Sequence, residues 1–130
     1  MVIDSSALLA IVLGEPEAAE FLRAIKGASI RRVSAASFLE TGMVLYRDRT
    51  GERRKLFEEL VVAFRLSITA VTEEQARIAL DAFDRYGKGR GHSAGLNFGD
   101  CFSYALAKVC AEPLLFKGED FSQTDISIAL

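Results

Sequence analysis

Short apolar segments alternate with pairs of amphipathic segments along the whole chain, and this order constrains the fold more than any other feature. Four segments have the length and composition of buried strands: Val2–Ile3, 29–33, 66–71 and 114–116. Two segments with helical periodicity separate each strand from the next. We therefore expect an α/β fold, a three-layer sandwich with a mostly parallel central sheet flanked by helices.

The six expected helices follow from apolar residues that recur every three or four positions. They cover residues 7–13, 16–26, 35–48, a segment around 57–64, 73–86 and 99–111. Two apolar stripes are expected to face the core: Ala35, Phe38, Leu39, Gly42, Met43 and Tyr46 in the third helix, and Ala76, Ala79, Leu80 and Phe83 in the fifth. The apolar residues between 126 and 130 predict a last strand or a docked tail.

The length of 130 residues is typical of a single domain, which we expect to cover residues 1–130. The longest apolar run, Ala7–Leu13, is far shorter than the roughly 18 residues needed to span a membrane. An acid at position 4, with no basic segment before it, argues against a secretory signal. Cys101 and Cys110 are about 13.5 Å apart along one expected helix, too far for a disulfide. A cytoplasmic protein is therefore expected.

The net charge of −2 does not exclude a polyanionic substrate. The chain has 18 acidic residues against 16 Lys and Arg. If four carboxylates are neutralised in a metal site, 14 acidic residues remain and the rest of the surface is slightly basic. Local basic patches can then hold a nucleic acid.

Four acidic residues lie at or near junctions of expected elements, where α/β sheets form their ligand sites. Asp4 directly follows the first strand, Asp100 begins the last helix and Asp120 follows the last strand. Glu40 lies in the third helix. Neither Glu40 nor Asp100 has a cation three or four positions away on its own helix, so no local ion pair explains either residue.

Each of these acids also has a purely structural interpretation. Asp4 could serve only as a helix N-cap, and Asp100 could only interact with the dipole of its helix. Glu40 could reach solvent at the edge of its stripe or pair with an arginine from elsewhere. In the turn after the last strand, Glu119 is an alternative to Asp120.

Four carboxylates in one cleft require a cation. At ~5 Å and an effective dielectric constant near ~20, each like-charged pair costs about 3 kcal/mol. Oxygen ligands without organised Cys or His favour Mg²⁺ or Mn²⁺. Such ions next to basic side chains are typical of phosphodiester hydrolysis, in which one metal activates water and a second stabilises the leaving oxygen. The four acids therefore predict a metal-dependent nuclease.

The segment 87–95 is rich in glycine and cations. It contains four glycines, Lys88, Arg90 and the only histidine, His92, which we assign no role. Its spacing differs from that of a phosphate-binding P-loop, which argues against an NTPase. We expect Lys88 and Arg90 to contact the backbone of a nucleic-acid substrate, although an ordinary solvated connection can have the same composition. A second charged segment, Arg49–Lys55, turns at Gly51.

Three segments resemble the PIN domain, and more narrowly the VapC ribonuclease toxins of type II toxin–antitoxin pairs. They are Met-Val-Ile-Asp-Ser-Ser-Ala-Leu at the start of the chain, Ser-Ala-Ala-Ser-Phe-Leu-Glu-Thr around Glu40, and Leu-Asn-Phe-Gly-Asp-Cys-Phe-Ser-Tyr-Ala-Leu-Ala around Asp100. The resemblance covers essentially the whole chain. It implies a Mg²⁺- or Mn²⁺-dependent endoribonuclease with RNA as substrate, homodimeric and held inactive by a small VapB-like antitoxin.

Carried over by position, the resemblance makes Asp4, Glu40, Asp100 and Asp120 the catalytic metal ligands and Ser6 a polar support of the first acid. Asp120 is preferred to Glu119 because it directly precedes Phe121, as in the Asp-Phe pair of the family. Lys117 and Gly118 occupy positions where the family often has other polar residues, which leaves the support of the fourth acid undefined.

Two other functions fit parts of this pattern. A phospho-accepting receiver domain also has an aspartate at a strand end, but it needs an acidic pair there, and Asp4-Ser5-Ser6 lacks one. A PIN-like module that binds RNA or a protein without cleaving it would share the fold. It would not need all four acids, so their presence favours the nuclease.

Overall fold

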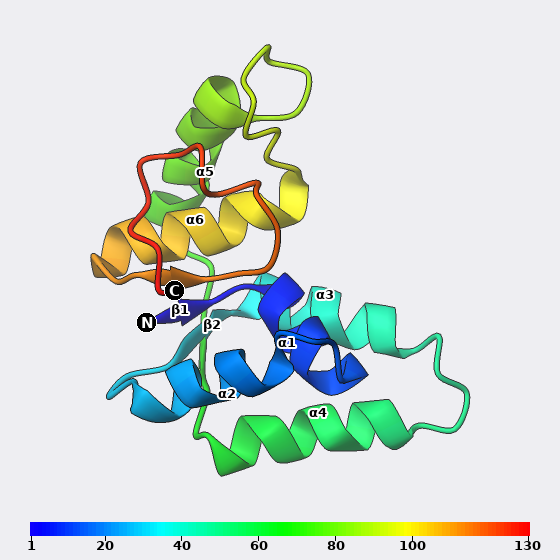
Figure 1. Ribbon diagram of the computed structural model, residues 1–130. Coiled ribbons are helices and arrows are strands. Elements are labelled where there is room, and N and C mark those ends of the chain that lie inside the picture. Colours follow the sequence, from blue (N-terminus) through cyan, green and yellow to red (C-terminus); the bar gives the residue numbers. More distant parts are fainter.

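Four short parallel strands form the centre of the computed structural model, which describes residues 1–130 (Figure 1). They are β1 (Val2–Ile3), β2 (Arg32–Ser34), β3 (Ser67–Thr69) and β4 (Leu114–Leu115), in the order β3-β2-β1-β4. Every pairing is parallel, and Val2 of β1 lies opposite both Arg32 and Leu114. The expected parallel sheet is confirmed.

Six helices surround this sheet, in the order that the sequence predicts. They are α1 (Ser5–Leu13), α2 (Ala18–Gly27), α3 (Ala35–Leu45), α4 (Glu52–Ala63), α5 (Glu73–Tyr86) and α6 (Phe98–Cys110). In Figure 1, α5 and α6 lie on one side of the sheet, whereas α1, α2 and α4 lie on the other. None of the six helices combines the length and the apolar character needed to cross a membrane.

β1 and β4 each contribute to two cores, because consecutive strand residues point to opposite faces of the sheet. Ile3 and Leu115 belong to a core formed with α1–α4, whereas Val2 and Leu114 belong to a core formed with α5 and α6. These four side chains are at most 1% exposed. Helices on both faces explain why β1 and β4 are apolar at both of their positions instead of alternating with polar residues. The predicted three-layer arrangement is therefore confirmed.

The C-terminal segment docks against β4 as a tail with a single bridge. The backbone N–H of Leu114 donates to the carbonyl of Ser127 at 2.8 Å, and that of Ala129 donates to the carbonyl of Leu114 at 3.0 Å. The side chain of Asp125 accepts hydrogen bonds from the Tyr104 hydroxyl at 2.6 Å and from Lys108 at 3.2 Å, both on α6. These bonds attach the tail to the α5–α6 layer.

The predicted buried face of α3 was wrong for its three largest outward residues, although Phe38 packs against the core as expected. Leu39, Met43 and Tyr46 are 61%, 63% and 70% exposed, and the helix instead buries Ser37 and Thr41 together with Leu45. Short hydroxyl side chains let α3 pack closely, and each finds a hydrogen-bond partner: Thr41 donates to the carbonyl of Ser37 at 2.8 Å, and the Ser37 hydroxyl lies 3.0 Å from that of Ser103. Burying these groups therefore leaves no hydrogen bond unmade.

The same correction applies to α5, where Leu80 is 70% exposed and Phe83 is partly exposed, while Ala82 and Tyr86 are buried. Apolar periodicity identifies residues that share a helix face. It does not say whether that face meets the protein's own core or lies at the surface.

Candidate functional site

The carboxyl ends of β1 and β2 define the site, because each strand leads at once into a helix. Asp4 lies between β1 and α1 with an extended backbone and is 2% exposed. Its Oδ2 accepts hydrogen bonds from the backbone N–H and the hydroxyl of Ser6, at 2.9 and 2.7 Å. Asp4 is therefore the N-cap of α1, as one interpretation of the sequence held, but this role occupies only one of its two oxygens.

The other oxygen of Asp4 is held by a chain of buried hydroxyls. Ser103 of α6 donates to Oδ1 at 2.6 Å, and the Ser37 hydroxyl of α3 lies 3.0 Å from that of Ser103. A hydroxyl has one proton to donate, so Ser37 must be the donor to Ser103. Both serines are at most 1% exposed. This chain links α1, α3 and α6 beneath the first acid.

Sequence reasoning missed Ser37 and Ser103. A signal was present: each lies three positions from a predicted acid, Ser37 before Glu40 and Ser103 after Asp100, and so on the same helix face.

Asp100 begins α6 and forms a reciprocal cap with Asn97. The backbone N–H of Asp100 donates to the Asn97 side chain at 3.0 Å, and the backbone N–H of Asn97 donates to Asp100 Oδ2 at 2.8 Å. Burial raises the pKa of Asp100 to about 7, although the hydrogen bond from Asn97 opposes this shift; the charges of Asp4, Asp120 and Glu40 raise the pKa further. Asp4, Glu40 and Asp120, all far from Asp100 in the sequence, therefore lie near enough for their charges to affect it.

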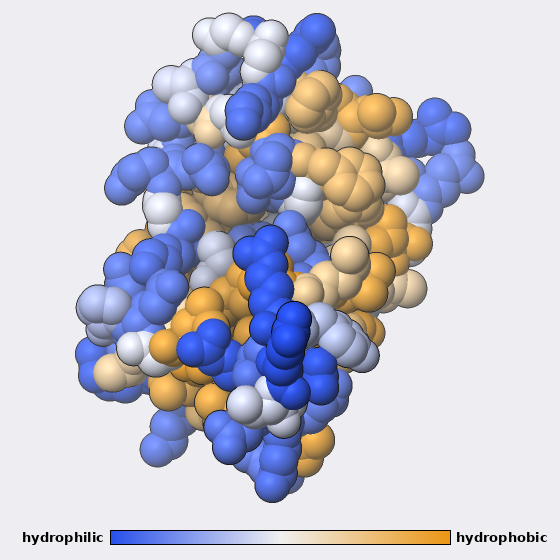
Figure 2. All heavy atoms as spheres, turned by 90° about the vertical axis from the view of Figure 1, so that its right-hand side faces the viewer, coloured by the Kyte–Doolittle hydropathy of each residue, from blue (hydrophilic) through white to orange (hydrophobic).

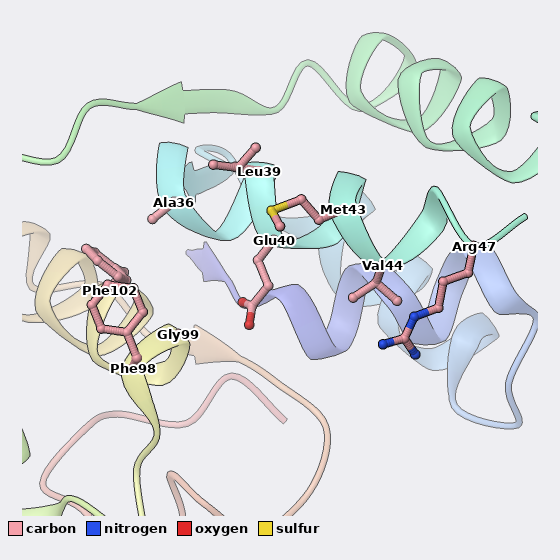
Figure 3. A pocket seen from close by; sticks show the side chains of 9 residues that line it. All are labelled: Ala36, Leu39, Glu40, Met43, Val44, Arg47, Phe98, Gly99 and Phe102. Carbon is pink, nitrogen blue, oxygen red and sulfur yellow. The ribbon is translucent and has the colours of Figure 1, made fainter.

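Glu40 extends from α3 toward the first turn of α6, as Figure 3 shows. A Cβ atom at position 99 would lie 2.6 Å from Oε1 and 2.9 Å from Oε2 of Glu40, so the close approach requires the glycine that is present there. Glu40 forms no ion pair with any Lys or Arg. Its carboxylate instead faces the amino end of a helix, where the backbone dipoles favour negative charge.

Asp120 and Glu119 differ in their surroundings, although both are exposed in the turn after β4. The charge of Asp120 contributes to the raised pKa of Asp100. The carboxylate of Glu119 accepts a hydrogen bond from Ser122 at 2.9 Å within its own turn. The turn is tied to α1, because the backbone N–H of Lys117 donates to the Ser6 hydroxyl at 3.0 Å. These contacts favour Asp120 as the fourth member of the group.

As positioned, no three acidic, His or Cys side chains converge tightly enough to coordinate one ion together. Like charges repel, and Asp4 and Asp100 are each drawn to hydrogen-bond donors of their own. The donor chemistry nevertheless fits a hard divalent cation. The four groups are carboxylates, and their mutual repulsion is what such an ion would relieve.

The loop 87–95 connects α5 to α6. Arg90 is ion-paired with Asp84 of α5, whereas Lys88 is exposed and has no acidic partner. His92 packs edge-on against Tyr86, with ring centroids 5.0 Å apart, and accepts a hydrogen bond from the backbone N–H of Ala94 at 3.1 Å. The histidine therefore organises its own loop.

A cavity of about 590 Å³ opens beside Glu40 (Figure 3). Its lining comes from α3, the residues that follow it and the start of α6: Ala36, Leu39, Glu40, Met43, Val44, Arg47, Phe98, Gly99 and Phe102. Phe98 is 80% exposed and meets Phe102 edge to face. Sequence reasoning did not single out Arg47 or Phe98.

Comparison with known families matches residues 1–127 to the PIN domain. Ribonuclease VapC30 of Mycobacterium tuberculosis is 51% identical over 129 residues, covering 98% of this chain and 96% of that protein. Ribonuclease VapC28 of the same species is 47% identical over 130 residues, covering 100% of this chain and 98% of that protein.

Two solved structures share the fold. The Mycobacterium tuberculosis toxin VapC20, described as cleaving the sarcin-ricin loop, superposes with a TM-score of 0.76 at 16% identity and covers 96% of this chain and 95% of its own. A chain of a toxin–antitoxin complex from Klebsiella pneumoniae gives a TM-score of 0.71 at 15% identity, with 95% and 92% covered.

Proposed function

The chain belongs to the PIN-domain family and, within it, to the VapC ribonucleases, and from this premise we propose how it acts. It is an endoribonuclease that hydrolyses RNA phosphodiester bonds, and it is the toxin of a type II toxin–antitoxin pair. The observation that supports this most strongly is the grouping of four acids from separate elements around the buried Asp100, whose pKa of about 7 reflects burial and the charges of the other three.

The proposed reaction depends on Mg²⁺ or Mn²⁺ held by Asp4, Glu40, Asp100 and Asp120. When bound, such a cation activates water and neutralises charge on the phosphate in the transition state. The chain's own contribution is orientation: Ser103 and Ser6 fix both oxygens of Asp4, and Gly99 leaves room for Glu40. Asp100 must lose its proton before it can bind the metal.

Incubation of the purified chain with total RNA tests this proposal. We expect new RNA ends with Mn²⁺ or Mg²⁺ and none when a chelator is added, and sequencing of the ends gives the cleavage site. RNA that is bound but left intact at every metal concentration would support a non-catalytic binding module instead.

We further infer that the chain forms a homodimer through its exposed apolar face. This face is contributed by α3, α5 and α6 and consists of Leu39, Met43, Leu80, Phe83, Phe98 and Phe102. Figure 2 shows hydrophobic side chains gathered on one side of this view. Contiguous exposed apolar surface of this kind marks an association site, and an isologous interface needs only one such face per copy.

Two matched substitutions test the dimer. Leu80→Glu places a charge in the apolar face and is expected to give a monomer in analytical ultracentrifugation. Val62→Glu is the control, because Val62 is 75% exposed on α4 and does not line that face. If both variants sediment like the unsubstituted chain, the interface lies elsewhere.

The partner that restrains the enzyme is, in this proposal, a VapB-like antitoxin. Co-expression of the chain with an antitoxin from the same genome should relieve growth inhibition and yield a complex that copurifies. Growth inhibition that no such partner relieves would argue against the toxin–antitoxin assignment while leaving the nuclease assignment intact.

A further inference from the structure

An arginine, Arg47, follows the end of α3 about two turns beyond Glu40 and on the same side of the helix (Figure 3). Glu40, Val44 and Arg47 follow the spacing of one helix face, and all three side chains point to the same side of α3 in Figure 3. Tyr46 keeps helical backbone angles (φ −63°, ψ −15°), so Arg47 lies about 10 Å from Glu40 along the helix axis. A cation is thus placed close to the acidic group but outside it.

Arg47 joins the cavity beside Glu40 to a second cavity of about 560 Å³ at the corner between α3 and α4. Val44 and Arg47 line both cavities. Arg49 and Arg53 line the second one, together with the acids Asp48 and Glu52. The two cavities therefore share the wall formed by Val44 and Arg47, and the second cavity adds two further arginines to Arg47.

These three guanidinium groups have no partner within the chain. Arg47, Arg49 and Arg53 are exposed and their side chains make no ion pair or hydrogen bond. By contrast, Arg90 is paired with Asp84, and Lys117 is paired with Glu15.

Asp48, the acidic residue nearest to these arginines in the sequence, forms hydrogen bonds with the backbone of the turn instead of ion pairs with them. The carboxylate of Asp48 accepts hydrogen bonds from the backbone N–H of Thr50 at 3.0 Å and from that of Arg53 at 3.1 Å. Gly51 holds a left-handed conformation with φ 79°, and Arg54 stacks on Tyr46 at 4.4 Å. The turn is therefore organised before any ligand binds, which lowers the entropic cost of binding.

We propose that Arg47, Arg49 and Arg53 form a phosphate-binding site that holds the backbone of the RNA substrate beside the acidic site. This inference rests on the proposed ribonuclease function. A cluster of carboxylates repels RNA, so cations must supply the attraction, and guanidinium groups match phosphate with two parallel hydrogen bonds. Backbone contacts of this kind give affinity and register without reading sequence.

The test compares two triple variants that remove equal charge. Arg47→Gln/Arg49→Gln/Arg53→Gln empties the proposed site. Arg23→Gln/Lys26→Gln/Arg65→Gln removes three exposed, unpaired cations from α2 and the residues after α4, at the opposite end of the molecule in Figure 1. Cleavage of a labelled single-stranded RNA is measured over a range of salt concentrations, and circular dichroism verifies that both variants fold.

We expect the first variant to raise KM by about tenfold or more while kcat changes little, because charged hydrogen bonds to phosphate are lost. The slope of log(kcat/KM) against log[salt] should become less steep by about 0.7 for each phosphate contact removed. The control should keep the KM and the slope of the unsubstituted chain. Equal KM and equal salt slope in the two variants would overturn the phosphate site.

Two further measurements keep this outcome separate from that of the proposed function. If the unsubstituted chain cleaves no RNA, the ribonuclease assignment fails, and fluorescence anisotropy with the same RNA still shows whether the three arginines bind it.

Single Arg47→Gln and Arg47→Lys variants replace the triple variant if it does not fold, and only Arg47→Lys should retain the salt slope. Normal RNA affinity with lost antitoxin binding would make the corner a protein-binding surface and refute the proposal.

Discussion

At the scale of single residues, the site depends on groups that serve two purposes. Asp4 caps α1 with one oxygen and accepts a hydrogen bond from Ser103 of α6 with the other. Asp100 caps α6 and is one of the four grouped acids. Because Asp4 and Asp100 are fixed by the same bonds that define a helix start, the fold itself positions these two carboxylates.

Gly99→Ala should separate activity from stability. Alanine favours a helix over glycine by about 1 kcal/mol, but the added Cβ would lie 2.6 Å from Glu40 Oε1 and displace the carboxylate. We expect cleavage to fall by about tenfold or more while the melting temperature holds or rises. Gly42→Ala on α3 is the control, because a Cβ there meets nothing within 4 Å. Equal activity in the two variants would show that the position of Glu40 is unimportant.

The pKa of Asp100, about 7, predicts a pH-dependent response to metal. The carboxyl must lose its proton to coordinate a cation, so affinity should rise with pH up to about 7 and then level off. The increase in melting temperature caused by Mg²⁺ should therefore be larger near pH 8 than near pH 6. A shift of equal size at both pH values would contradict direct coordination by Asp100.

At the scale of elements, the order of strands and helices was predictable because each element is encoded locally, by apolar periodicity and by capping residues such as Asp4 and Thr72. The outward faces of α3 and α5 were not predictable. The stripe with Leu39 in α3 and the stripe with Leu80 in α5 both look like core in the sequence. The packing of Ser37 against Ser103 shows that α3 buries a different face.

The attachment of the C-terminal tail to α6 should weaken at acid pH. The hydrogen bond from Tyr104, together with Lys108 and Arg85, lowers the pKa of Asp125 to about 2. A depressed folded-state pKa stabilises the fold above the unfolded value of about 3.9, and this stabilisation is lost as the pH falls toward 2. Asp125→Asn should lower the melting temperature near neutral pH, and the difference should shrink below about pH 4. A difference that is independent of pH would mean that the carboxylate charge contributes nothing.

At the scale of the whole molecule, one sheet edge gathers residues from four separate parts of the sequence. The sequence predicted that Asp4, Glu40, Asp100 and Asp120 belong together, because each lies at or near an element junction. It did not predict the hydroxyls beneath Asp4 or the arginines beside Glu40, since those contacts depend on how α3 packs against α6 and where it ends. Although the net charge is only −2, the molecule has a group of acidic residues and, next to it, the three unpaired arginines Arg47, Arg49 and Arg53.

The most direct test of whether these acids act together through a metal is the initial rate of Mn²⁺-dependent RNA cleavage by five folded single variants. Four remove the proposed ligands: Asp4→Asn, Glu40→Gln, Asp100→Asn and Asp120→Asn. The fifth, Glu119→Gln, removes the neighbouring acid that is engaged in its own turn. We predict that the first four lose about a hundredfold or more in rate and that Glu119→Gln retains the rate of the unsubstituted chain. Cleavage at the unsubstituted rate by Asp4→Asn or Asp100→Asn would contradict a shared metal site.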